Sequence, residues 1–84
     1  MQNPNTMQKP ITDTAPNILY RICKHLQRRD IKAGYGSETY MLAYHSIISY
    51  QDPWLSLGEI LDDAWNCKLI TDQEHDYICN HYQI

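Results

Sequence analysis

A histidine and a cysteine that share one helical face are the side chains with the clearest potential for chemistry. His75 and Cys79 lie four positions apart, which puts both on one side of a helix, and Cys23 with His25 could add two more ligands. Zinc is held by four such nitrogen and sulfur groups in tetrahedral geometry. The three cysteines form no CxxC pair, and residues two apart diverge on a helix. We therefore expect reduced thiols and surface histidines, with no metal site and no cofactor.

A cysteine nucleophile is the second chemistry that these residue types allow. Cys79 could combine with His75 and Asp76, or Cys67 with a distant histidine. Such a site also needs a pocket and a group that stabilises an oxyanion. The chain has 84 residues and its first 14 show no apolar periodicity, so little room remains for a pocket. We expect no catalytic residues and a protein that is not an enzyme.

Carboxylates and aromatic side chains gather in the C-terminal part of the chain. Residues 52–84 hold seven carboxylates against one cation, Lys68, a net charge of −6. The aromatic set is seven Tyr, two Trp and no Phe, a bias typical of interfaces, although tyrosines at the edge of a core give the same composition. We predict that this surface binds a larger protein or protein–nucleic acid complex through Trp54, Glu59, Asp62, Asp63, Trp65, Asp72, Asp76 and Tyr77. The alternative is that the carboxylates only keep the domain soluble.

Basic residues gather earlier in the chain. Residues 15–33 contain five cations and one carboxylate, Asp30, which gives a net charge of +4. Cations on one helix can bind the phosphate backbone of a nucleic acid. The alternative function is therefore a small DNA-binding transcriptional regulator that uses Arg21, Lys24, Arg28, Arg29 and Lys32. The overall charge of −3 weighs against direct nucleic-acid binding. A homodimer that buries the aromatic surface is a further possibility.

The basic residues belong to a predicted first helix. Leu19, Ile22, Cys23 and Leu26 recur at helical spacing after an N-cap at Asp13 or Thr14, and Gly34-Tyr35-Gly36 ends the helix near residue 32. A second helix, capped by Ser37, should end before Asp52-Pro53 and be the most enclosed element.

Two capping-box sequences predict the remaining helices. Ser56-Leu57-Gly58-Glu59 begins a third helix that extends to Lys68, and Thr71-Asp72-Gln73-Glu74 begins a fourth that extends to the end. The fold class is therefore all-α, a small four-helix bundle or an orthogonal helical array. Residues 1–14 are expected to form a flexible N-terminal arm, and residues 15–84 a single helical domain.

No apolar run approaches the roughly 20 residues of a membrane span, and no signal-peptide pattern is present, so we expect a cytoplasmic protein. In size and charge the chain is similar to small acidic helical proteins of phages and mobile elements that bind and block a host complex, anti-CRISPR inhibitors included. That resemblance covers no residue motif. It implies an inhibitor whose carboxylates cover arginines and lysines of a nucleic-acid-handling complex in the host cytoplasm.

Overall fold

Four α-helices make up the part of the chain that this computed structural model describes, residues 11–35 and 38–84. They are α1 (Ala15–Lys32), α2 (Thr39–Ile48), α3 (Leu57–Asn66) and α4 (Asp72–Tyr82). No strand occurs in these two ranges, so the all-α fold predicted from the sequence is confirmed. In the same ranges, every helix is too short or too polar to cross a bilayer.

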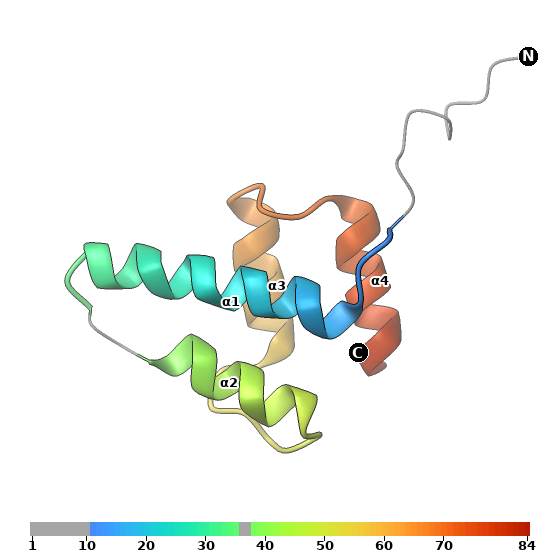
Figure 1. The fold of residues 1–84 in the computed structure, drawn as a ribbon, viewed down its shortest axis with the longest axis horizontal. Helices are drawn as coiled ribbons and strands as arrows, with labels where there is room; N and C mark the ends of the chain where they lie inside the picture. Colours follow the sequence, from blue (N-terminus) through green and yellow to red (C-terminus); the bar gives the residue numbers. More distant parts are fainter. Residues whose placement is uncertain (1–10, 36–37) are drawn as a thin grey trace, which may run out of the picture.

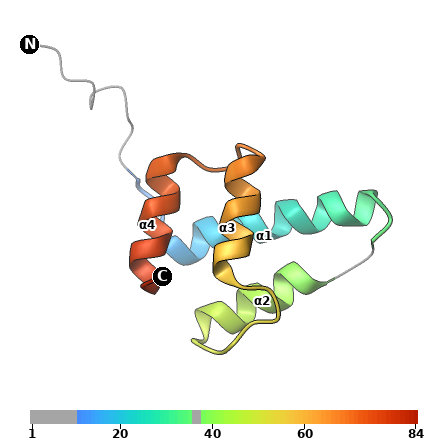
Figure 2. The same cartoon turned by 180° about the vertical axis from the view of Figure 1, so that it is seen from behind.

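The helices form two antiparallel pairs that cross each other. In Figure 1, α2 runs back beneath α1, and α3 and α4 stand behind α1 and transverse to it. Figure 2, from behind, shows α3 and α4 side by side in front of α1. Of the two predicted arrangements, the orthogonal array is the one observed. α1 contacts all three other helices and therefore positions both surfaces described below.

The core is centred on α1, which contributes six buried residues, whereas α2 contributes three. The prediction that the second helix is the most enclosed element is therefore wrong. Its composition is apolar on nearly every side, yet α2 lies at the outside of the array and leaves Leu42 in solvent. The buried residues are Ala15, Ile18, Leu19, Ile22, Cys23, Leu26, Tyr40, Ala43, Ile47, Leu57, Ile60, Leu61, Ala64, Ile70 and Ile78.

Hydroxyl side chains begin three of the helices. The Asn17 amide donates to Thr14 Oγ1 at 3.3 Å, and the Glu59 amide donates to Ser56 Oγ at 3.2 Å. At Thr71 the capping box is complete, because the Glu74 carboxylate also accepts from the Thr71 amide at 2.9 Å. The predicted box at Ser56 is formed only in half, which leaves the Glu59 side chain exposed. Ser37 lies outside the described residues, and α2 begins after Glu38 with no side-chain cap.

The first three helices end in the same way, with one residue in the left-handed region after the C-cap. That residue is Gly34 (φ 93°) after α1, Tyr50 (φ 56°) after α2 and Lys68 (φ 61°) after α3. In each case the next amide donates to the carbonyl five residues back, at 2.8 or 2.9 Å, as in a Schellman motif. Only the first of these ends has the glycine that this conformation favours.

The predicted N-terminal arm is described only at its end. Residues 1–10 lie outside the described residues. Ile11 packs against the core, and the Asp13 carboxylate accepts a hydrogen bond from the Thr14 amide at 2.9 Å. The described chain is thus held to the domain from residue 11 onward.

Candidate functional site

One carboxylate of the predicted binding surface, the half-buried Asp63, connects its own helix with two others. Asp63 on α3 accepts two hydrogen bonds from the Arg29 guanidinium of α1, at 3.0 and 3.1 Å, and a third from the Tyr40 hydroxyl of α2 at 3.0 Å. Arg29 also donates to Asp30, at 3.0 and 3.1 Å. The Cys67 thiol lies 3.6 Å from both Arg29 Nη1 and Asp63 Oδ1. These contacts tie α1, α2 and α3 together at one point.

The charges of this cluster shift its pKa values in the directions that the contacts require. Hydrogen bonds from Arg29 hold the pKa of Asp63 below its usual value, against the opposing effect of burial. The same bonds raise the pKa of Arg29. Burial, and then the neighbouring Asp63 carboxylate, raise the pKa of Tyr40. At neutral pH the cluster is an ion pair with a phenol, so Arg29 and Asp63 offer little charge to a partner.

A second group of acidic and aromatic residues forms a patch where α3 ends and α4 begins. Trp65, 48 % exposed, donates through Nε1 to Asp72 Oδ1 at 2.5 Å, and its ring centroid lies 5.9 Å from that of His75. His75 Nε2 lies 3.8 Å from Asp62 Oδ1, and Nδ1 lies 3.7 Å from Asp76 Oδ1. We call these five residues the Trp65 patch. It unites four of the residues predicted to bind a partner.

The residues considered for metal binding do not converge. Cys79 Sγ lies 3.7 Å from His75 Nδ1, as their spacing predicts, and burial raises the pKa of Cys79. Cys23 is fully buried in the core, and burial raises its pKa to about 12. Within residues 11–35 and 38–84, no three His, Cys, Asp or Glu side chains are placed to hold a metal ion.

An exposed tryptophan and leucine line a groove at the other end of α3. Trp54 is 95 % exposed and Leu42, on α2, is 57 % exposed. Together with Thr39 and Leu55 they enclose about 350 Å³. We call this the Trp54 groove. Trp54 precedes α3 and Trp65 lies in its last turn, and a helix of that length spans about 15 Å. The two tryptophans predicted to border the acidic surface therefore lie toward opposite ends of α3.

Two predicted partner residues, Glu59 and Tyr77, belong neither to the Trp65 patch nor to the residues that line the Trp54 groove. Tyr77 is half-buried and packs against the core. Glu59 is exposed on α3, four positions after Leu55 of the groove. Sequence reasoning missed Thr39, Leu42 and Leu55 as surface residues. For Leu42 the signal was that α2 is apolar around nearly its whole circumference, which leaves one side without a place in the core.

The five predicted nucleic-acid-binding cations fall into two classes. Arg29 is held by Asp63, and Arg21 donates to Asp13 Oδ2 at 3.1 Å. Lys24 Nζ lies 5.9 Å from the centre of the Tyr20 ring. In the described part of the chain, Arg28 and Lys32 form no ion pair and are exposed. Lys24, Arg28 and Lys32, spaced by four, form a basic stripe along the outer face of α1.

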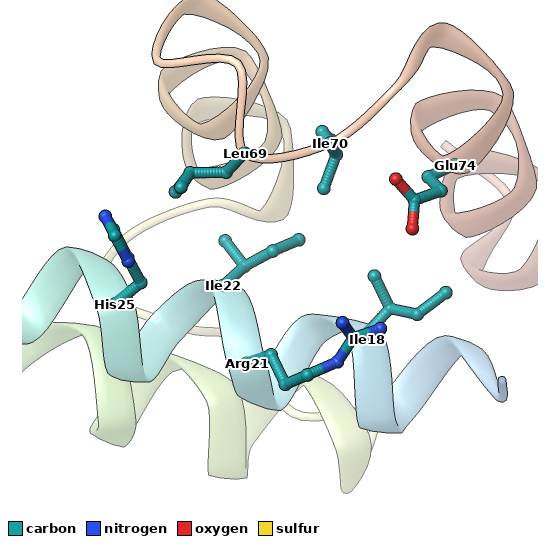
Figure 3. Close-up of a pocket in the computed structure, with 7 residues that line it drawn as sticks. All are labelled: Ile18, Arg21, Ile22, His25, Leu69, Ile70 and Glu74. Carbon is teal, nitrogen blue, oxygen red and sulfur yellow. The ribbon is translucent and has the colours of Figure 1, made fainter.

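A small cleft lies between α1 and the connection from α3 to α4, with a volume of about 160 Å³. Figure 3 shows His25 and Leu69 at one end and Glu74 at the other, with Ile22 between them. The Glu74 carboxylate is engaged in the capping box of α4. The cleft is smaller than the roughly 300–1,000 Å³ of small-molecule sites and separates its titratable groups.

No protein family model, no curated protein and no solved structure matches this chain.

Proposed function

We propose that this chain is a non-enzymatic protein-binding module whose main contact is the Trp54 groove. The observation that carries the proposal is the exposure of Trp54, at 95 %, beside the exposed Leu42. Placing an indole and an isobutyl group together in water forgoes several kcal/mol of hydrophobic stabilisation that burial would supply. Tryptophan is also one of the residues enriched among interface hot spots. A partner that covers the groove recovers this free energy.

The acidic surroundings favour a basic partner. The Trp65 patch adds a second exposed tryptophan with Asp62, Asp72 and Asp76 around it. Carboxylates of this kind speed association with a positively charged surface. We propose that the partner is a larger nucleic-acid-handling complex, and that the chain inhibits it by covering the arginines and lysines that hold phosphates. The size and charge that the chain shares with phage and mobile-element inhibitors agree with this proposal.

Affinity capture tests the proposal. Tagged wild type, Trp54→Ala and Trp65→Ala are passed over a lysate of the source cell or its host, and circular dichroism checks that each variant folds. We expect one large partner in stoichiometric amount, with the Trp54→Ala variant losing at least 2 kcal/mol, or about 30-fold, in affinity. Because Trp54 is almost fully exposed, its removal should change the free energy of unfolding by no more than about 0.5 kcal/mol. Equal capture by all three proteins would refute the proposal.

The basic stripe of α1 favours one alternative, a nucleic-acid-binding regulator. Its carrying observation is that Lys24, Arg28 and Lys32 follow one another at single-turn spacing on one face of α1, with Arg28 and Lys32 exposed. This alternative predicts retention on heparin and duplex DNA that falls steeply with salt, and loss of retention when the three residues become Glu. The protein-binding proposal predicts little retention at moderate salt.

A further inference from the structure

The chain segment that forms the Trp54 groove carries no lysine or arginine of its own. Residues 33–67 contain no lysine or arginine, and every such residue of the sequence except Lys68 lies at or before residue 32. Three exposed carboxylates, Glu38, Asp52 and Glu59, lie within four positions of residues that line the groove. Among the described residues, these three form no ion pair. The residues that line the groove are therefore mostly apolar, and the charged residues next to them in the sequence are all negative.

The shape of the groove limits how a polypeptide can dock. The described ranges contain no strand, so no sheet edge is present to which an extended peptide could add. Polyproline ligands dock in grooves lined by several aromatic rings, whereas this groove has one ring, two leucines and a threonine. Leu42 and Thr39 lie three apart on one face of α2, opposite Trp54 and Leu55. An apolar trough beside a helix suits aliphatic side chains that project from one face of a second helix.

We infer that the Trp54 groove binds an amphipathic helix whose apolar stripe is flanked by lysines or arginines, within the partner protein. The apolar stripe covers Trp54 and Leu42, and the flanking cations reach the neighbouring carboxylates. This inference rests on the proposed function and specifies the chemistry of the partner at the same site.

Three synthetic peptides of about five helical turns test the inference. The first has leucines at helical spacing and lysines elsewhere; the second replaces every lysine by glutamate; the third replaces every leucine by serine. Binding is measured by the fluorescence anisotropy of the labelled peptide. A Trp65→Phe variant leaves Trp54 as the only tryptophan, so its emission reports on the groove directly.

We expect the Leu/Lys peptide to bind and to shift the Trp54 emission to the blue. The Leu/Glu and Ser/Lys peptides should each bind at least about 10-fold more weakly, a loss of about 1.4 kcal/mol. Trp54→Ala should weaken the Leu/Lys peptide by a similar factor, whereas Trp65→Ala, which removes an indole at the other end of α3, should leave affinity within about 2-fold.

A matched pair of charge variants separates the effect of the neighbouring carboxylates from that of the overall charge. Asp52→Asn with Glu59→Gln removes two carboxylates beside the groove, and Asp62→Asn with Asp76→Asn removes two from the Trp65 patch, so both proteins have the same net charge. The first pair should weaken the Leu/Lys peptide several-fold more than the second. Equal weakening would place the contact outside the groove and overturn the inference.

Several other outcomes would also overturn the inference. These are equal binding of the Leu/Glu peptide, equal binding of the Ser/Lys peptide, full retention by Trp54→Ala, and the absence of binding. Concentration-dependent dimerisation that Trp54→Ala abolishes would assign the groove to a second copy of the chain. Lysate capture that depends on Trp54, without binding of the Leu/Lys peptide, would leave the proposed function standing while the inference fails. Peptide binding without any captured partner would contradict the proposed function instead.

Discussion

At the scale of single residues, Asp63 and Asp62 are adjacent carboxylates with different roles. Asp63 accepts hydrogen bonds from Arg29, 34 positions earlier, and from Tyr40, whereas Asp62 faces solvent 3.8 Å from His75. Both belong to one acidic run, and both were predicted to contact a partner. Which of the two meets an arginine depends on how α1 crosses α3. The sequence therefore predicts the acidic run but not the division of labour within it.

Asp63→Asn should destabilise the fold by about 1–2 kcal/mol at pH 7, because it leaves the Arg29 guanidinium without its charged acceptor. The folded-state pKa of Asp63 is lowered, so its stabilisation is complete above the unfolded value near 3.8 and is lost as the pH falls through the lower folded value. Urea unfolding at pH 7 and at pH 2.5 measures this. The difference between wild type and variant should shrink at the lower pH.

Asp62→Asn is the control, because it removes a neighbouring exposed carboxylate. It should change the free energy of unfolding by no more than about 0.5 kcal/mol at pH 7. Comparable effects of the two substitutions would mean that the hydrogen bonds to Asp63 contribute no more stability than a solvated carboxylate.

At the scale of helices, the sequence predicted where the helices begin better than it predicted which helix is most buried. Thr14, Ser56 and Thr71 each accept a backbone hydrogen bond at the predicted position. These contacts join residues three apart and need no tertiary structure. The prediction that the second helix is the most enclosed element was wrong because burial depends on tertiary structure. Apolar residues surround the helix in sequence, but only the crossing of the other helices decides which of them are covered.

Lys68→Gly should stabilise the fold by about 0.5–1 kcal/mol. Lys68 holds φ at 61° in the turn after α3, where a Cβ costs roughly 1–2 kcal/mol, and the entropy that glycine gains in the unfolded chain offsets part of this. Thermal and urea unfolding measure the change. Lys68→Ala removes the same charge but keeps the Cβ, so it should not stabilise. If alanine stabilises as much as glycine, charge and not backbone conformation would be the cause.

At the scale of the whole molecule, charge segregation was readable from the sequence but the groove was not. The acidic and basic segments follow directly from composition. The groove needs Leu42 on α2 to face Trp54, twelve positions later, across the bend between α2 and α3. Trp54 and Trp65 were grouped because both were expected to border one acidic surface, and the length of α3 separates them by more than a side chain can span.

Segregated charge should act on the rate of association with a basic partner, and Trp54 on the rate of dissociation. Raising the salt from 0.05 to about 0.5 M shortens the Debye length to a few Å and should slow association about 10-fold or more. Trp54→Ala should leave association nearly unchanged and speed dissociation. Surface plasmon resonance or stopped-flow fluorescence with the captured partner separates the two rates. Salt-independent association would contradict a role for the carboxylates in steering.

The confinement of lysine and arginine also fixes how the molecule responds to reagents. Trypsin should release α2, the Trp54 groove and α3 as one peptide from Ala33 to Lys68, since no cleavage site lies within it. Amine-directed dyes and cross-linkers can attach at Lys68, at the N-terminus or at lysines up to Lys32, and at none of the residues that line the groove. A protein immobilised through its amines therefore keeps the groove chemically intact, and a cross-link to a ligand seated there must come from the ligand's own amines.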